Sequence, residues 1–287
     1  MTGPVMDERR YTDLIKTRSA PMEPTPTGLS PAGALRAPVR AVLFDVYGTL
    51  FISGSGDVEV LKDSVQIGSL GVLLRRYGVS EEPESVRRAF YERIETLHEE
   101  GRREGVDHPE VVTERVWADV LDLESPEQYR LFSLEYELLF NPVWPSPGLE
   151  TVLQEVRSRG TVMGIVSNAQ FFTPLLFKAF FNRDVREIGF DPELVLYSYV
   201  YGYAKPSPFL FERARETLGT RDVKPEQVLY VGNDMLNDIY AASLTGFQTA
   251  LYAGDRRSLR LRREDERCRG TAPDLAITDL RQLSDVL

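Results

Sequence analysis

Short runs of β-branched and apolar residues recur from residue 39 onward and predict buried β-strands. Runs of this length without alternation are typical of strands covered on both faces of a sheet. Helical signals separate the runs: residues 149–160 end in glycine, and residues 207–219 begin with Ser207 as a candidate N-cap and Pro208 in the first turn. The alternation predicts an α/β fold with a doubly wound, mostly parallel sheet. The strand runs are 39–45, 161–168, 193–200, 227–234, 248–253 and 274–278.

The stretch from 57 to 145 has a different pattern and predicts helices only. Apolar residues recur at helical spacing within 84–100 and 125–140, and Ser125 followed by Pro126 is a helix start signal. This stretch interrupts the α/β pattern just after the first strand, which ends at Asp45. Ligands of such sheets bind at the carboxyl ends of the strands, so we expect a helical cap over that edge.

These patterns divide the chain into three parts. Residues 1–37 are rich in Pro, Gly, Ser and Thr without a period, which predicts a flexible N-terminal arm. Residues 38–52 and 148–287 form the predicted α/β core, and residues 53–147 form the predicted helical cap.

Composition excludes several classes of function. A net charge of −10 disfavours binding to nucleic acid or an anionic membrane. One cysteine and two histidines leave too few ligands for a cysteine- or histidine-rich metal site. The chain has no apolar run near the ~20 residues that span a bilayer, and its first residues lack a signal-peptide core. We expect a cytoplasmic protein with no membrane or nucleic-acid partner; the sequence leaves monomer and homodimer open.

Polar residues follow the predicted strands at positions where they can converge. One such residue alone is usually a cap or turn former, but several sets at equivalent strand ends point to a site. The first strand ends at Asp45, and a loop after the third run contains Lys205. The other members of the set are Ser167 and Asn168 after the second run, and Asn233, Asp234 and Asp238 after the fourth.

This combination suits phosphoryl transfer. A carboxylate can act as a nucleophile and form a covalent intermediate. Mg²⁺ held by carboxylates would reconcile a negative nucleophile with a negative substrate. A lysine and a hydroxyl would steady the transferring group, and the turn through Gly48 and Thr49 would offer backbone N–H groups to the anion.

Four ordered segments resemble the haloacid dehalogenase superfamily: FDVYGTLF, IVSNA, AKPSP and YVGNDMLND. The similarity spans about residues 39–287 and includes the position of the helical insertion. It implies a Rossmann-like core and assigns roles by position: Asp45 as nucleophile, Ser167 as a ligand of the transferred group, and Lys205 as its counter-charge. Asp234 and Asp238 would help to hold Mg²⁺.

Two positions depart from the phosphatase pattern of that superfamily. Phosphatases usually have a second Asp two residues after the nucleophile as general acid and base, and here that residue is Tyr47. A tyrosine there resembles the metal-independent dehalogenases, although its backbone carbonyl can still bind a metal. In the fourth segment Asn233 stands where an acid is usual, so either Asn233 or Asp234 faces the metal. Because clustered carboxylates repel without a cation, we weigh this segment toward Mg²⁺.

The favoured interpretation is a hydrolase that acts through an aspartyl intermediate on Asp45, with a small anionic phosphorylated metabolite as substrate and Mg²⁺ as cofactor. One alternative is a metal-independent 2-haloacid dehalogenase-like hydrolase, which would need a cap arginine such as Arg75, Arg76, Arg87 or Arg88 for the substrate carboxylate. The other alternative is a phosphate- or metabolite-binding module without turnover.

Overall fold

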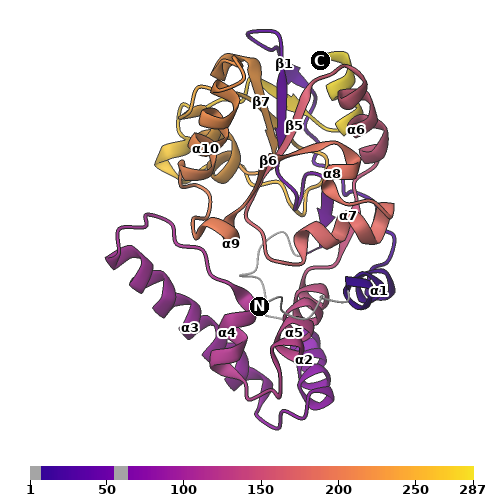
Figure 1. The fold of residues 1–287 in the computed structure, drawn as a ribbon, viewed down its shortest axis with the longest axis vertical. Helices are drawn as coiled ribbons and strands as arrows, with labels where there is room; N and C mark the ends of the chain where they lie inside the picture. Colours follow the sequence, from indigo (N-terminus) through magenta and orange to yellow (C-terminus); the bar gives the residue numbers. More distant parts are fainter. Residues whose placement is uncertain (1–7, 55–63) are drawn as a thin grey trace.

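A seven-stranded sheet forms the centre of the computed structural model, which describes residues 8–54 and 64–287 (Figure 1). All neighbouring strands are parallel except β1, which pairs antiparallel with β9 at one edge. The fold class predicted from the sequence is therefore confirmed. In spatial order the strands are β1 (Ala32–Gly33), β9 (Leu275–Ile277), β8 (Gln248–Tyr252), β7 (Val228–Gly232), β2 (Ala41–Phe44), β5 (Val162–Ser167) and β6 (Phe190–Tyr197).

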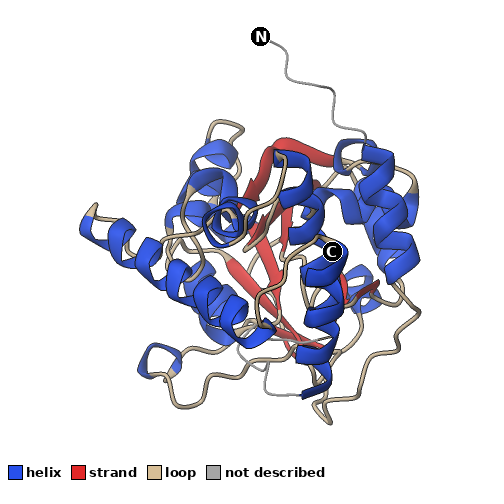
Figure 2. Ribbon diagram, turned by 90° about the horizontal axis from the view of Figure 1, so that it is seen from below, coloured by secondary structure: helices blue, strands red, loops and turns tan. Residues whose placement is uncertain are grey.

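Helices cover both faces of this sheet (Figures 1 and 2). Strand β2 shows why its sequence is apolar throughout: Val42 and Phe44 pack into one hydrophobic cluster, and Ala41 and Leu43 pack into the other. The first cluster includes residues of α6 (Leu149–Ser158), α7 (Thr173–Phe181), α8 (Val185–Ile188) and the 3₁₀ helix η4 (Leu280–Asp285). The second includes residues of α10 (Phe209–Gly219) and α11 (Ala241–Ser243).

Each of the six predicted strand runs contains a strand, but two local expectations are wrong. Residues 198–200 of the third run lie in the short helix α9 (Ser198–Tyr201) rather than in β6. The N-cap of α10 is Pro208, and the Ser207 hydroxyl instead accepts a hydrogen bond from the Phe209 N–H. The remaining short helices are η1 (Pro225–Gln227), the π-helical η2 (Met235–Tyr240) and η3 (Glu266–Cys268).

The inserted segment forms a separate helical unit, defined here as residues 64–140 (Figure 1). Its helices pack around their own aromatic cluster, which includes Phe90, Trp117, Phe132 and Tyr136. A two-stranded sheet of β3 (Phe51–Ser53) and β4 (Val143–Pro145) joins the chain entering this unit to the chain leaving it. The helices are α2 (Ser64–Arg76), α3 (Pro83–Arg103), α4 (Thr113–Val120) and α5 (Pro126–Phe140).

The prediction of a flexible arm over residues 1–37 is wrong for residues 8–37. Helix α1 (Glu8–Arg18) packs against α7 of the core and α5 of the helical unit. Tyr11 and Ile15 lie one helical turn apart and are only 2% and 0% exposed, respectively. Composition predicted flexibility because it registers neither this short apolar stripe nor the pairing of β1 with β9. Residues 1–7 lie outside the described residues.

Within the described part of the chain, no helix has both the length and the apolar character needed to cross a bilayer.

Candidate active site

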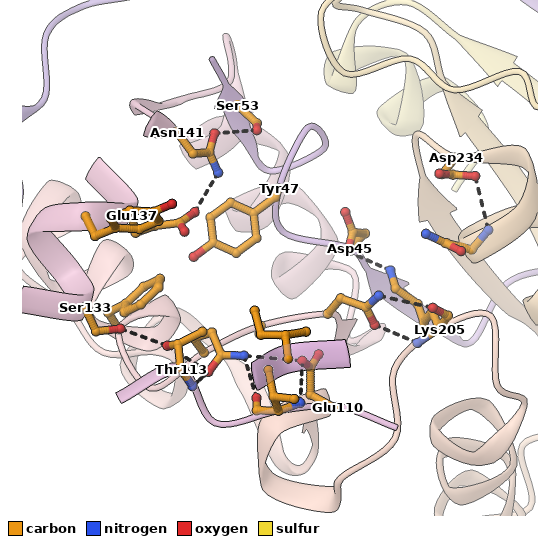
Figure 3. A pocket seen from close by; sticks show the side chains of 18 of the residues that line it. Asp45, Tyr47, Ser53, Glu110, Thr113, Ser133, Glu137, Asn141, Lys205 and Asp234 are labelled. Carbon is orange, nitrogen blue, oxygen red and sulfur yellow. Dashed lines mark hydrogen bonds and ion pairs between the residues drawn. The ribbon is translucent and has the colours of Figure 1, made fainter. Parts of the chain in front are cut away.

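A cavity of about 410 Å³ lies where the carboxyl ends of β2, β5 and β7 meet the helical unit. This volume is within the range of small-molecule sites. Core residues such as Asp45 and Lys205 form one side, and residues such as Glu110 and Glu137 form the other (Figure 3). The edge of the sheet predicted to bind a ligand is therefore the edge that borders the cavity.

Asp45 follows β2 directly and is 6% exposed. Its Oδ1 accepts hydrogen bonds from the Ser167 hydroxyl at 2.9 Å and from the Lys205 ammonium at 2.7 Å. Its Oδ2 accepts no hydrogen bond from the described residues. One oxygen is thus fixed by the core while the other remains available to a ligand.

Lys205 lies between two carboxylates. Its Nζ is 2.7 Å from Asp45 Oδ1 and 2.5 Å from Asp238 Oδ1, and it also donates to the Tyr230 hydroxyl at 2.9 Å. Burial alone would lower the pKa of Lys205, but the carboxylates of Asp238 and Asp45 raise it above its usual value. Lys205 is therefore a cation at neutral pH.

The loop that contains Lys205 is tied to the loop after β5. The Asn168 side chain accepts from the Lys205 backbone N–H at 2.7 Å and donates to the Lys205 carbonyl at 3.2 Å. These two bonds fix the backbone from which the lysine reaches Asp45.

Asp238 lies in the π-helical turn η2, a rare geometry that is common at functional sites. Its Oδ2 accepts the backbone N–H groups of Asn233 and Asp234, both at 2.9 Å. Gly232 makes this approach possible, because a Cβ there would stand 2.4 Å from the carboxyl carbon of Asp238. Burial raises the pKa of Asp238 to about 6, against the opposing effect of Lys205, so the group is ionised above that pH.

Asp234 and Asn233 are both engaged with protein groups. Asp234 caps η2 through the backbone N–H groups of Leu236 and Asn237 and pairs with Arg262 at 2.7 Å. Asn233 donates its amide N–H to the Ser258 carbonyl and accepts from the Thr49 hydroxyl. The ion pair of Asp234 and the hydrogen bonds of Asn233 therefore stabilise the loop after β7.

Of the residues predicted to bind the transferred group, Asn168 and Lys205 line the cavity, whereas Gly48, Thr49 and Ser167 do not. The Gly48 N–H does not face an anion, because it donates to the Phe51 carbonyl at 2.7 Å. Gly48 has a φ of +82°, and a Cβ there would meet Ser258 at 2.6 Å. Thr49 and Ser167 are fully buried and hold Asn233 and Asp45, respectively.

Tyr47 lines the cavity, but its hydroxyl is hydrogen-bonded to Thr173 Oγ1 at 3.0 Å. In Figure 3 the ring lies between Glu137 and Asp45, with the hydroxyl directed away from Asp45. Burial raises the pKa of Tyr47 well above its usual value, and the carboxyl of Glu137 adds to the effect. The phenol is therefore a poor proton donor at neutral pH.

Three groups at the site were missed in the sequence. Tyr230 lies inside a strand and bonds Lys205, Asp238 and the Val166 carbonyl, yet strand tyrosines usually only pack. Glu110 and Glu137 come from the helical unit, where no motif marks them. The arginine-rich run 254–270 also contributes Arg260 and Arg262 to the cavity lining.

The oxygen donors fit a divalent cation only in part. Asp45 Oδ2 and the Tyr47 carbonyl accept no hydrogen bond from the described residues, and the Asn233 amide oxygen accepts one although it has two lone pairs. Asp234 pairs with Arg262, and Lys205 is shared between Asp238 and Asp45. These three carboxylates therefore exceed their two paired cations by one negative charge. Within the described ranges, no group of three His, Cys, Asp or Glu residues could hold a metal ion.

A comparison with protein families identifies the family of this chain. Residues 39–246 match the family described as haloacid dehalogenase-like hydrolase. A glyceraldehyde 3-phosphate phosphatase of Methanopyrus kandleri is 26% identical, over 87% of this chain and 97% of the relative. The rhythmically expressed gene 2 protein of Drosophila melanogaster is 27% identical over 36% of this chain and 37% of its own. The structure of a HAD phosphatase from Thermococcus onnurineus, 21% identical, matches with a TM-score of 0.55 over 86% of this chain and 97% of that chain, which supports the fold.

Proposed function

Because this chain belongs to the haloacid dehalogenase-like hydrolases, we propose that it hydrolyses a small phosphorylated metabolite through a covalent intermediate on Asp45. The observation that carries this proposal is the state of Asp45 itself. One carboxylate oxygen is fixed by Ser167 and Lys205, the other accepts no hydrogen bond from the described residues, and Asp45 lines the cavity. A nucleophile needs this combination of fixed orientation and one available lone pair.

The proposed reaction has two steps. Asp45 Oδ2 attacks phosphorus while the bond from phosphorus to the ester oxygen breaks, which leaves a phosphoryl group on Asp45 and releases an alcohol. Water then attacks that phosphorus, and the bond to Asp45 breaks to give inorganic phosphate and the free carboxylate. Lys205 pairs with Asp45 in the resting state and would stabilise the negative charge of the phosphoryl oxygens in both steps.

The charge distribution of the cavity favours a phosphate ester over a 2-haloacid. A haloacid carries a carboxylate that needs a cation on the cap side. Among the described residues of the helical unit, those lining the cavity include Glu110 and Glu137 but no Arg or Lys. None of the four arginines considered for that role, Arg75, Arg76, Arg87 and Arg88, lines it.

The relatives favour the same chemistry. The Methanopyrus protein that matches most of this chain is named for the hydrolysis of glyceraldehyde 3-phosphate. We infer a substrate of similar class, a small phosphorylated metabolite enclosed by the helical unit, which would act as a cap. Exclusion of water by such a cap strengthens every electrostatic contact inside the site.

Mg²⁺ belongs to this proposal as the cofactor. The Asp45 carboxylate, the Tyr47 carbonyl and the Asn233 amide oxygen would hold it, and its charge would offset the repulsion between the nucleophile and the substrate. Because only one of these donors is a carboxylate, we expect weaker binding than at a site with two.

The test uses p-nitrophenyl phosphate and 2-chloropropionate, each with Mg²⁺ and with EDTA. We expect hydrolysis of the phosphate ester with Mg²⁺ and its loss in EDTA. Release of chloride in EDTA, without hydrolysis of the ester in either buffer, would establish the dehalogenase alternative and overturn the proposal. Asp45→Asn is the control for both substrates, because it keeps the side-chain shape without the nucleophilic carboxylate.

A further inference from the structure

The reaction proposed above needs a proton donor that the usual position does not supply. An alcohol leaves a phosphate ester well only if its oxygen receives a proton as the bond breaks. The residue two positions after Asp45 is Tyr47, whose hydroxyl is bonded to Thr173 and whose pKa is raised by burial. Another acid must therefore reach the same cavity.

The carboxyl groups of the core are already committed to other roles. Asp45 is the nucleophile of the proposal, Asp238 is paired with Lys205, and Asp234 is paired with Arg262. The remaining carboxyl groups that line the cavity come from the helical unit: Glu110 and Glu137.

Glu110 is held only by neutral donors. It accepts from the Ser198 hydroxyl at 2.6 Å, from the Val111 N–H at 3.0 Å and from the Gln170 amide at 3.4 Å. It makes no ion pair with a Lys or Arg of the described residues. A buried carboxyl group without a cation keeps its proton more readily than one in water.

The backbone places Glu110 beside the two loops that support Asp45. Its own N–H donates to the Gly202 carbonyl, three residues before Lys205. The Ser198 hydroxyl that bonds Glu110 also accepts from the Ala169 N–H, two residues after Ser167. In Figure 3 Glu137 lies on the far side of the Tyr47 ring from Asp45. Glu110 is thus the carboxyl group of the helical unit that the loops of the site hold directly.

The ionisation of Glu110 matches the need for an acid and a base near neutral pH. Burial raises its pKa from 4.5 to about 7, while the hydrogen bonds from Ser198 and the Val111 N–H act in the opposite direction. Other titratable groups also line the cavity. From the helical unit they are His98 on α3 and Tyr136 and Glu137 on α5; from the core they are Asp45, Tyr47, Lys205, Asp234, Asp238, Arg260 and Arg262. Burial lowers the pKa of His98, so this imidazole is neutral at pH 7 and adds no cation.

We propose that Glu110 is the general acid and base of the reaction, taking the role for which Tyr47 is unsuited; this proposal rests on the phosphatase function proposed above. In the first step the Glu110 carboxyl gives its proton to the ester oxygen as the phosphorus–oxygen bond breaks, so the alcohol leaves neutral. In the second step the Glu110 carboxylate takes a proton from the attacking water, which restores the acid. The proton count balances over the two steps.

The test separates proton donation from a structural role by changing the leaving group. p-Nitrophenol leaves without a proton, whereas the alcohol of glycerol 3-phosphate does not. In Glu110→Gln we expect a burst of p-nitrophenol, one per enzyme, at a rate within about threefold of wild type. Transfer of the phosphoryl group from glycerol 3-phosphate to Asp45 should slow by about 10²- to 10⁴-fold, the usual contribution of a general acid. Glu110→Asp should recover part of the rate with glycerol 3-phosphate.

Glu114→Gln is the matched control. Glu114 is a partly buried carboxyl group on α4 that pairs with Arg130 and does not line the cavity, so both rates should remain at the wild-type value. Equal losses on both substrates in Glu110→Gln, or no loss on glycerol 3-phosphate, would overturn the role of Glu110 and leave the phosphatase function intact. A wild-type chain without hydrolysis that depends on Asp45 would overturn the phosphatase function itself.

Discussion

At the scale of single residues, the site depends on Lys205 as the cation between Asp45 and Asp238. All three side chains are almost completely buried, and Lys205 is the cation that both carboxylates share. Removing one partner of a buried ionic group leaves an uncompensated charge, which is far more costly than losing a surface pair.

We therefore expect Lys205→Met to lower the free energy of unfolding by about 3–5 kcal/mol at pH 8. The loss should be smaller at pH 5. Burial raises the pKa of Asp238 to about 6, so this carboxylate can then bind a proton, which removes its repulsion with Asp45. Urea unfolding at the two pH values measures this difference. Lys178→Met is the control, since Lys178 forms an exposed pair with Glu8 and should cost less than about 1 kcal/mol. A pH-independent loss would contradict the account.

The raised pKa of Glu110 leads to a separate prediction about how folding stability depends on pH. Its pKa is about 7 in the folded chain and near 4.5 in the unfolded chain, so the folded state binds more protons between these values. Stability from this group is present below pH 4.5 and is lost as the pH rises through 7, by up to about 3 kcal/mol.

Glu110→Gln mimics the protonated carboxyl at every pH. The variant should match wild type near pH 4.5 and be more stable than wild type at pH 8, as measured by thermal unfolding across that range. An unchanged difference between the two proteins from pH 5 to pH 8 would show that Glu110 has an ordinary pKa.

The sequence revealed those site residues that follow strands in a fixed order. Asp45, Ser167 and Lys205 could be predicted because each belongs to a motif with a strand before it. Tyr230 and Glu110 could not be predicted. Tyr230 resembles any other strand residue in the sequence, and Glu110 lies in a loop without a recognisable motif. Their roles arise only from three-dimensional contacts with Lys205 and Ser198.

At the scale of secondary-structure elements, helix α1 connects the core to the helical unit. Figure 1 shows it at the junction of the two, and its ion pairs reach both: Glu8 with Lys178 of α7, and Arg18 with Glu135 of α5. The contribution of these exposed pairs is small, so the buried side chains Tyr11 and Ile15 provide most of the stabilisation.

Ile15→Ala should therefore destabilise the folded chain by about 2–5 kcal/mol, the usual cost of truncating a buried aliphatic side chain. Asp13→Ala, on the exposed face of the same helix, should change stability by less than about 0.5 kcal/mol. Denaturant unfolding measures both. Equal, negligible effects would support the flexible arm predicted from composition.

The elements differ in how far the sequence predicts them. The central strands are predictable because β2 and its parallel neighbours are buried on both faces and read as continuous apolar runs. Strand β1 consists of Ala32 and Gly33 alone, which is too short for a hydrophobic pattern. It forms because its backbone pairs with the edge strand β9. The π-helical turn η2 likewise depends on Asp238 packing over Gly232 rather than on any local signal.

At the scale of the whole molecule, the insertion brings two chemically different surfaces to one cavity. The core contributes a carboxylate with its lysine, and the helical unit contributes carboxyl groups without cations. Neither surface contains the complete set of groups that the reaction needs. The helical unit follows β2 and β3 in the chain, so the segment that carries Asp45 immediately precedes β3 and the insertion.

The central claim is that Asp45 becomes covalently phosphorylated during turnover. The most direct measurement is mass spectrometry of peptides from enzyme mixed with p-nitrophenyl phosphate and quenched in acid within one turnover. The account predicts the mass of one phosphoryl group on the peptide that contains Asp45, and neither this adduct nor turnover in Asp45→Asn. Continued turnover by Asp45→Asn, with no adduct on that peptide in the wild-type enzyme, would contradict it.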